Sequence, residues 1–291
     1  MKTFVVVTLA MVVVSFGQAA VPSPKGATPE TLRAELDRGE RAFRRGAYGD
    51  AIAVATGLIL RDPQNTNAYL LRGQAYEASY QHDKAVADFD AVLRLEPRAA
   101  SVYQHRGCER FKLGQIAEAL GDFDRFLELV PGQRPHHWQR GIALYYADRF
   151  EDGRKQFELH QTVNPSDVEN AVWHYLCVAR SAGLEKAAAS LIEIEGDTRV
   201  PMMQIYALFR GQGSPREVLA AADVGQPSAD ELKNRLFYAH LYLGLYYEAR
   251  GQPKLVEEHM VKAAGPYAQP HYMGDVARVH LQLLQKKAPK K

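Results

Sequence analysis

The chain has 291 residues, of which 46% are hydrophobic, so it is long enough to bury one large core or two smaller ones. Its 36 basic and 34 acidic residues leave a net charge of +2. A nucleic-acid partner usually leaves a basic excess in the sequence, and this balance shows none, so we expect no nucleic acid among the partners.

Residues 1–19 have the pattern of a secretory signal peptide. Lys2 precedes an apolar run that ends at Val14, and the small residue Ala19 suits cleavage before Ala20. The run is short for a bilayer crossing, and no other stretch is a transmembrane candidate. We therefore expect an exported protein, periplasmic or secreted, that is not a stable transmembrane protein. An uncleaved N-terminal anchor is the alternative.

Glycine and proline recur at a fixed interval along the next part of the chain. At a spacing of 34 residues the sequence places Gly39, Gly73, Gly107 and Gly141, and at the same spacing Pro63, Pro97, Pro131 and Pro165. This period is typical of helix-turn-helix repeats, whose units stack because none of them buries its apolar face alone. The sequence therefore predicts an all-α solenoid.

Small residues mark where the two helices of each repeat cross. With repeats beginning at Leu32, Thr66, Ala100 and Arg134, position 8 is glycine and position 20 is Ala51, Ala85, Ala119 or Gly153. A bulky residue at either position would overpack the crossing at a cost of roughly 1 to 3 kcal/mol. The proline at position 32 ends the second helix, because it cannot continue the hydrogen-bond ladder.

The segments Asn67 to Pro97 and Ser101 to Pro131 resemble tetratricopeptide repeats (TPRs) at nearly every signature position. The resemblance implies a right-handed α-α superhelical TPR solenoid. We expect a linker and helix start over residues 20–31 and four repeats over residues 32–165.

The pattern is weaker after Pro165. Three capping signatures predict helix starts there: Ser166 with Glu169, Ser214 with Glu217, and Ser228 with Glu231. We expect degenerate TPR-like helical pairs over 166–227, a further TPR unit over 228–268, a C-terminal helix over 269–286 that caps the open end of the solenoid, and a basic tail over 287–291.

The order of these parts resembles the NlpI family of bacterial outer-membrane lipoproteins, most specifically over Arg140 to Arg149. That resemblance implies an envelope adaptor that presents cell-wall hydrolases to a processing protease. The chain departs from the family because it lacks the acylated lipoprotein cysteine. Cys108 and Cys177 are its two cysteines, and we expect both to be buried and free, since two repeats separate them and a disulfide needs Cα atoms within about 7 Å.

The first helices of the repeats should line a concave groove, because positions 2, 5, 9 and 12 share one helix face. We predict the following partner-binding residues in or beside this groove: Phe43, Leu70, Gln74, Glu77, Gln104, Phe111, Trp138, Ile142, Tyr145 and Tyr146. Its aromatic members could anchor a partner. The sequence leaves open the alternative that Trp138 and Tyr145 pack against neighbouring repeats as ordinary core.

The expected ligands are proteins or peptides. The TPR clamp for chaperone C-terminal carboxylates needs basic residues and asparagine at inward positions, where the first repeat has Leu36 and Glu40. A segment of another kind is therefore expected.

No catalytic, cofactor or metal site is predicted. The chain has 10 histidines, but none has metal-ligand spacing, and the adjacent His136 and His137 would diverge by about 100° on a helix. Nucleophile-elbow and phosphate-loop patterns are absent. The aspartates that flank Phe89 and Phe123 are expected on solvated helix faces.

The sequence thus predicts an exported, non-catalytic TPR adaptor or scaffold that binds proteins through its concave groove, in the maintenance of the cell envelope. The alternative is a structural or assembly component of an envelope or organelle complex. The sequence also leaves open whether the protein forms a homodimer.

Overall fold

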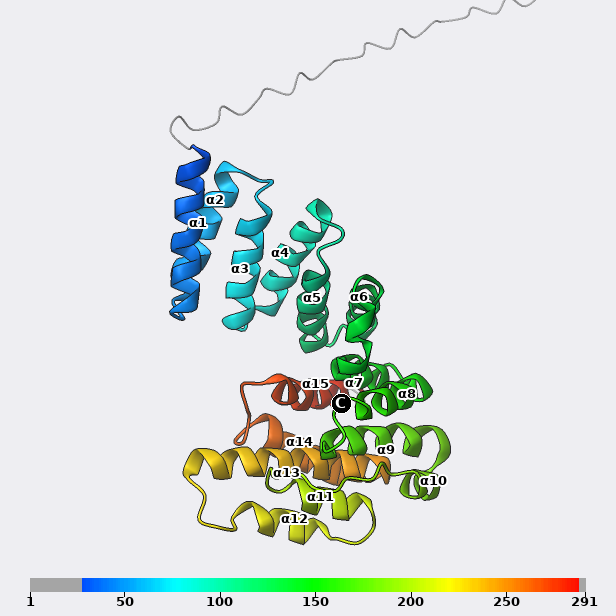
Figure 1. Ribbon diagram of the computed structural model, residues 1–291. Coiled ribbons are helices and arrows are strands. Elements are labelled where there is room, and N and C mark those ends of the chain that lie inside the picture. Colours follow the sequence, from blue (N-terminus) through cyan, green and yellow to red (C-terminus); the bar gives the residue numbers. More distant parts are fainter. Residues whose placement is uncertain (1–27, 288–291) are drawn as a thin grey trace, which may run out of the picture.

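The computed structural model describes residues 28–287, and within this range the chain contains helices and no strand (Figure 1). The predicted signal peptide and most of the predicted basic tail lie outside the described residues. The first eight α-helices are α1 (Pro29–Arg44), α2 (Tyr48–Arg61), α3 (Thr66–Ala78), α4 (His82–Leu95), α5 (Ala100–Lys112), α6 (Ile116–Leu129), α7 (Trp138–Tyr146) and α8 (Phe150–Gln161), with a 3-10 helix η1 (Pro131–His136) before α7. The others are α9 (Val168–Ala182), α10 (Leu184–Ala189), α11 (Met202–Phe209), α12 (Pro215–Ala222), α13 (Ala229–Ala249), α14 (Pro253–Ala264) and α15 (Tyr272–Lys287).

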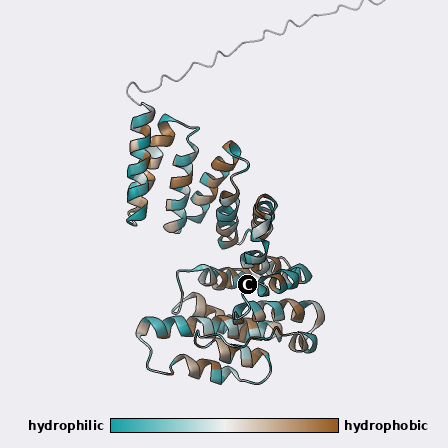
Figure 2. Cartoon of the chain, viewed as in Figure 1, coloured by the Kyte–Doolittle hydropathy of each residue, from teal (hydrophilic) through white to brown (hydrophobic). Residues whose placement is uncertain are grey.

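Helices α1 to α8 form four hairpins that stack in chain order, each helix against the next (Figure 1). The apolar side chains between the first hairpins form small separate clusters. One of these clusters contains Ala42, Ala51, Ala55, Leu71 and Ala75, and another contains Ala85, Phe89, Val92, Leu93 and Val102. The helix at the N-terminal edge, α1, is largely hydrophilic (Figure 2). The first three repeats are therefore joined by small separate cores, as expected for a solenoid.

The recurring glycines lie where the helices of a hairpin are in closest contact. A Cβ atom on Gly107 would lie 2.6 Å from the ring of Phe123, and one on Gly141 would lie 2.7 Å from the ring of Phe157. Ala85 and Ala119, at the other predicted crossing position, are fully buried. The close crossings predicted from the small residues are confirmed.

An arginine in each of three repeats joins two second helices. Arg106 binds Asp122, 16 residues ahead on α6, at 2.5 Å, and Asp90, 16 residues behind on α4, at 2.6 Å. In the same arrangement Arg72 contacts Asp88 and Thr56, and Arg140 contacts Asp124 and Gln156.

We call the set of Arg72, Arg106 and Arg140 with their contacts the arginine ladder. The prediction that its aspartates lie on solvated helix faces was wrong for two of them. Asp88 and Asp122 are only 4% and 2% exposed. They are buried because each accepts hydrogen bonds from the arginine of its own repeat, which offsets the cost of removing a carboxylate from water.

The fourth hairpin begins later than the predicted repeat start at Arg134. Residues Pro131–His136 form the 3-10 helix, and α7 has only 9 residues from Trp138. Pro131 and Pro135 lack the backbone N–H that an α-helix needs, which accounts for the delay. The side chain of His137 caps α7 by accepting a hydrogen bond from the backbone N–H of Arg140.

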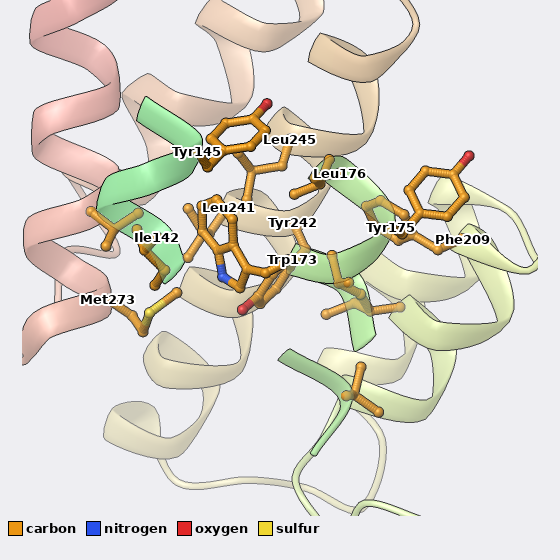
Figure 3. Packing of buried hydrophobic residues seen from close by; sticks show 14 of the residues in the cluster. Ile142, Tyr145, Trp173, Tyr175, Leu176, Phe209, Leu241, Tyr242, Leu245 and Met273 are labelled. Atoms are coloured by element: carbon orange, nitrogen blue, oxygen red, sulfur yellow. The ribbon is translucent and has the colours of Figure 1, made fainter. Parts of the chain in front are cut away.

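Helices α9 to α15 share a single large core with α5 to α8. Figure 3 shows part of it, with Trp173, Tyr175, Phe209, Leu241 and Tyr242 contributed by α9, α11 and α13. Helix α9 packs against α7, α8, α10, α11 and α13, so this core joins elements that are far apart in the sequence.

The predicted helix starts in this half are confirmed at two of three places. Ser214 and Glu217 form a complete capping box at α12, and Ser228 accepts a hydrogen bond from the Glu231 backbone at α13. At α9 the prediction of Ser166 as the cap was wrong, because Asp167 caps the helix.

The last helix does not cap the open end of the solenoid, so that prediction was wrong. Helix α15 folds back against α14 and α5 and ends beside the middle of the repeat array (Figure 1). Tyr272 stacks on Phe111 with ring centroids 5.3 Å apart, and His280 Nδ1 lies 3.0 Å from the hydroxyl of Tyr146. These aromatic contacts favour packing against α5 and α7 over exposure at the end of the array.

Candidate partner-binding surfaces

The concave side of the first two repeats is open. A cleft of about 540 Å³ lies between α1 and α3, and we call it the N-terminal groove. It is lined by Leu32, Arg33, Leu36, Asp37, Glu40, Asn65 and Asn67. Charged, amide and apolar groups alternate on this surface, so it can contact both the backbone and the side chains of an extended segment.

Five of the six predicted binding residues of the first three repeats are half-buried and partly engaged. Leu70 packs against the core between repeats, and the ring of Phe43 lies 5.6 Å from that of Tyr48. Glu77 forms a 2.9 Å hydrogen bond with His105, and this bond raises the pKa of His105. The other two predicted residues of this group, Gln74 and Gln104, are also half-buried.

Three predicted groove residues are instead buried in the interior. Phe111, Ile142 and Tyr145 are 0%, 1% and 2% exposed, because α15, α9 and α13 cover them. The Tyr145 hydroxyl donates a 2.6 Å hydrogen bond to Glu248 at the end of α13, and burial raises its pKa well above the usual range. For these residues the prediction of an exposed groove lining was wrong, and for Tyr145 the alternative of ordinary core packing holds. Tyr146 is half-buried against His280 of α15.

Trp138 has a different position, because it lines a second cleft. This cleft has a volume of about 560 Å³ and is assembled from α7, α8, α9, α13 and the start of α15. We call it the aromatic cleft. Its lining consists of His136, Trp138, Ile142, Phe157, His160, Val163, Asn164, Asp167, Glu169, Asn170, Trp173, Tyr238, His271, Tyr272 and Met273.

Paired rings hold the walls of the aromatic cleft in place. Trp138 meets Tyr272 edge to face with centroids 5.1 Å apart, and Tyr238 stacks on His271 at 5.8 Å. Trp173 is 1% exposed and lies over Phe157. Such pairs restrict ring motion, so the cleft is already formed without a ligand.

Two carboxylates, one on α9 and one on its cap residue, form the acidic part of the aromatic cleft. Arg199 binds Asp167 and Glu169, at 2.6 Å each, and also Asp197. The Tyr242 hydroxyl donates a 2.5 Å hydrogen bond to Glu169. Burial raises the pKa of Glu169 to about 6, although Arg199 and Tyr242 oppose the shift. A cation placed beside Glu169 would favour its ionised form.

Four side chains of the aromatic cleft each bury a polar atom that no protein group satisfies within residues 28–287. The atoms are Asn170 Oδ1, Trp173 Nε1, His271 Nε2 and the Tyr272 hydroxyl. Unsatisfied buried polar atoms are costly and uncommon in native proteins. The atoms of Asn170, Trp173 and His271 mark a place in the cleft where a ligand can supply hydrogen bonds.

The sequence did not reveal most of the aromatic cleft. Only Trp138 and Ile142 were among the predicted binding residues, whereas Glu169, Trp173, Tyr238 and Tyr272 were missed. One signal was present: the chain has 2 tryptophans, Trp138 and Trp173, and both line this cleft.

Other reactive groups of the described chain form no second centre. Cys177 is buried and Cys108 is half-buried, and both are free. Burial raises the pKa of the Cys108 thiol to about 12. Between residues 28 and 287 there is no group of three or more His, Cys, Asp or Glu side chains placed to hold a metal ion. None of the helices in that range combines the length and apolar character needed to cross a bilayer.

No family model matches the chain, and no curated protein matches it. Solved structures do resemble its fold. A tetratricopeptide repeat protein from Parabacteroides merdae ATCC 43184 superposes with a TM-score of 0.58 at 13% identity, over 88% of this chain and 99% of that one. A crystal structure of MamA gives 0.52 at 17% identity, over 56% and 88%. MamA from Desulfovibrio magneticus RS-1, residue 41 to the end, gives 0.51 at 18%, over 56% and 92%.

These structures and the stacked hairpins together define the fold class. The chain is a right-handed α-α superhelical TPR solenoid, as the sequence predicted. At these identities the likeness is one of fold.

Proposed function

We propose that this protein is a non-catalytic scaffold that binds a segment of another protein along the N-terminal groove. The observation that supports this most directly is the open concave face of α1 and α3, in contrast to the covered face of α5 and α7. Arg33, Asp37 and Asn67 are exposed there and offer donors and acceptors for an extended backbone.

We further propose that the protein is exported and acts in the cell envelope as an adaptor of the NlpI type. Support for export comes from the signal-peptide pattern of residues 1–19, and support for the adaptor role comes from the resemblance over Arg140 to Arg149. The partner would then be an envelope protein.

Groove variants combined with crosslinking test the binding surface. A Leu36→Asp, Asn67→Arg double variant should lose the partner that the native chain crosslinks in envelope extract, because it places new charges in the N-terminal groove. The matched control is Leu60→Asp on α2, where the leucine is already 80% exposed. If the double variant stays folded and yields the same crosslinks as the native chain, the groove is not the binding surface.

N-terminal sequencing tests export. The chain, produced in a bacterium with a periplasm, should be recovered from the periplasmic fraction with Ala20 as its first residue. Recovery of the uncut chain from the cytoplasm would overturn the proposed location. Gel filtration of the same sample tests the rival assembly role, which requires a stable oligomer.

A further inference from the structure

We propose that the aromatic cleft is a second binding site and that it takes the arginine side chain of a protein segment. The cleft is built by α7, α8, α9, α13 and α15. These helices lie apart from α1 and α3, which form the N-terminal groove; Figure 1 shows the separation of the helices. This assignment of the aromatic cleft depends on the proposed function in one respect, namely that the ligand is a segment of a protein.

The walls suit a planar cation on an apolar stem. Trp138, Trp173, Tyr238 and Tyr272 present aromatic side chains, which attract cations through their ring faces. A guanidinium stacks on such rings and is less strongly hydrated than an ammonium, while the methylene stem of arginine can lie along apolar walls. The volume of about 560 Å³ is in the range of pockets for small ligands.

The charge of the lining also selects a cation. Asp167 and Glu169 are part of it, whereas no lysine or arginine of residues 28–287 lines the cleft. Arg199 shows that these two carboxylates bind a guanidinium in this fold, at 2.6 Å each. Each carboxylate oxygen can accept two hydrogen bonds, and Glu169 Oε2 accepts one, from Tyr242, within the described chain. Capacity for a further donor therefore remains at Glu169.

The unsatisfied polar atoms point to the rest of the ligand. Trp173 and Asn170 are 1% and 3% exposed, and both leave a polar atom without a protein partner. Figure 3 shows the Trp173 indole nitrogen on the side of the ring toward Ile142 and Met273, which also line the cleft. A bound segment can supply a carbonyl to the indole N–H and an N–H donor to the Asn170 oxygen.

Intrinsic fluorescence gives a direct test, because the two tryptophans of the chain both line the aromatic cleft. The purified chain is titrated with an N-acetylated, C-amidated glycine-arginine-glycine peptide and with matched peptides carrying lysine, citrulline or phenylalanine in the centre. The arginine peptide should give a saturable change, and the neutral citrulline peptide should bind at least about tenfold more weakly. No response to the arginine peptide, equal binding of arginine and citrulline, or tighter binding of phenylalanine overturns the proposal.

Two variants locate the binding. Glu169→Gln should weaken the arginine peptide about tenfold or more, whereas Glu185→Gln, an exposed glutamate on α10 outside the cleft, should leave its affinity unchanged. Tyr238→Phe should weaken it roughly threefold, since it removes a hydroxyl group from the cleft wall and keeps the ring. Tyr238 is half-buried, so the loss of this one oxygen is a conservative change. If Glu169→Gln does not fold, unchanged affinity in Tyr238→Phe overturns the proposal.

The two binding surfaces can fail separately. Loss of partner crosslinks in the groove variant together with an arginine peptide that leaves the fluorescence unchanged keeps the proposed function and overturns the cleft assignment. A saturable arginine-specific response with groove variants that keep every crosslink gives the opposite result.

Discussion

The repeat array and the C-terminal half are both made of helix hairpins, yet they bury their apolar side chains differently. Between the first hairpins the cores are small and separate, as in the cluster around Leu71 and the one around Phe89. From α5 onward one continuous core also includes residues of α9, α11, α13 and α15. The array is thus held by neighbour contacts, and the C-terminal half by contacts that are distant in sequence.

The difference decides where a partner can bind. A solenoid that is held together only by contacts between adjacent repeats leaves its concave face open along its whole length. Here the long-range packing of α15 closes that face at Phe111 and Tyr145 and creates the aromatic cleft beside Trp138. A degenerate repeat pattern therefore signals a change of packing and not a loss of structure.

The largest expected effect comes from the continuous core. Phe237→Ala on α13 removes a fully buried ring and should cost about 4 kcal/mol of unfolding free energy, since the surrounding helices cannot close the cavity. Hydrogen exchange should rise throughout α9 to α15, because they share this core. Exchange that rises only next to position 237 would mean that this half is not cooperative.

A matching change in the array should act locally. Leu71→Ala removes a 4% exposed side chain between the first two repeats and should cost about 3 kcal/mol. Hydrogen exchange should rise in α1 to α4 and stay unchanged in α9 to α15, because each repeat packs mainly on its neighbours. A rise across the whole chain would contradict the division into two packing modes.

Acid should weaken the C-terminal half through a buried histidine pair. His240 on α13 lies 2.8 Å from His259 on α14, and burial lowers the pKa of His240 from 6.5 to about 4. Because the unfolded chain binds this proton more tightly, the stability contributed by neutral His240 is complete above pH 6.5 and falls as pH decreases, by about 2 kcal/mol at about pH 4.5.

Denaturant unfolding at both pH values measures this effect. In a His240→Gln variant the unfolding free energy should no longer show this loss on acidification. In His136→Gln, which changes an exposed histidine, the loss should remain. If the unfolding free energy falls by the same amount between the two pH values in the native chain and in His240→Gln, the histidine pair does not control stability in acid.

The smallest expected effects test the close helix crossings of the array. Gly107→Ala places a methyl group 2.6 Å from the ring of Phe123 and should cost about 2 kcal/mol by overpacking. Gly121→Ala in the same repeat meets nothing within 4 Å and should instead stabilise the helix by up to about 1 kcal/mol. Thermal unfolding of the two variants should shift in opposite directions, and a shift in the same direction would contradict the crossing geometry.

The arginine ladder shows how far a periodic sequence can be interpreted. Arg72, Arg106 and Arg140 recur at the repeat interval, and the residues 16 positions away on each side are their contacts. The pattern is visible in the sequence. Burial of Asp88 and Asp122 was missed, because charge at a helix surface predicts solvent contact unless the partner on the next helix is known.

The sequence alone determined the TPR solenoid and the hairpins of its first half, because the interval of 34 residues, the crossing glycines and the capping residues act through local contacts. Only the tertiary structure decided that α15 packs against α5 and that some of the predicted groove residues are buried. It also decided that Trp138, Glu169 and Tyr238 meet in one cleft. The physical reason is that these choices depend on which apolar faces pack together across long sequence separations, and no short pattern specifies that pairing.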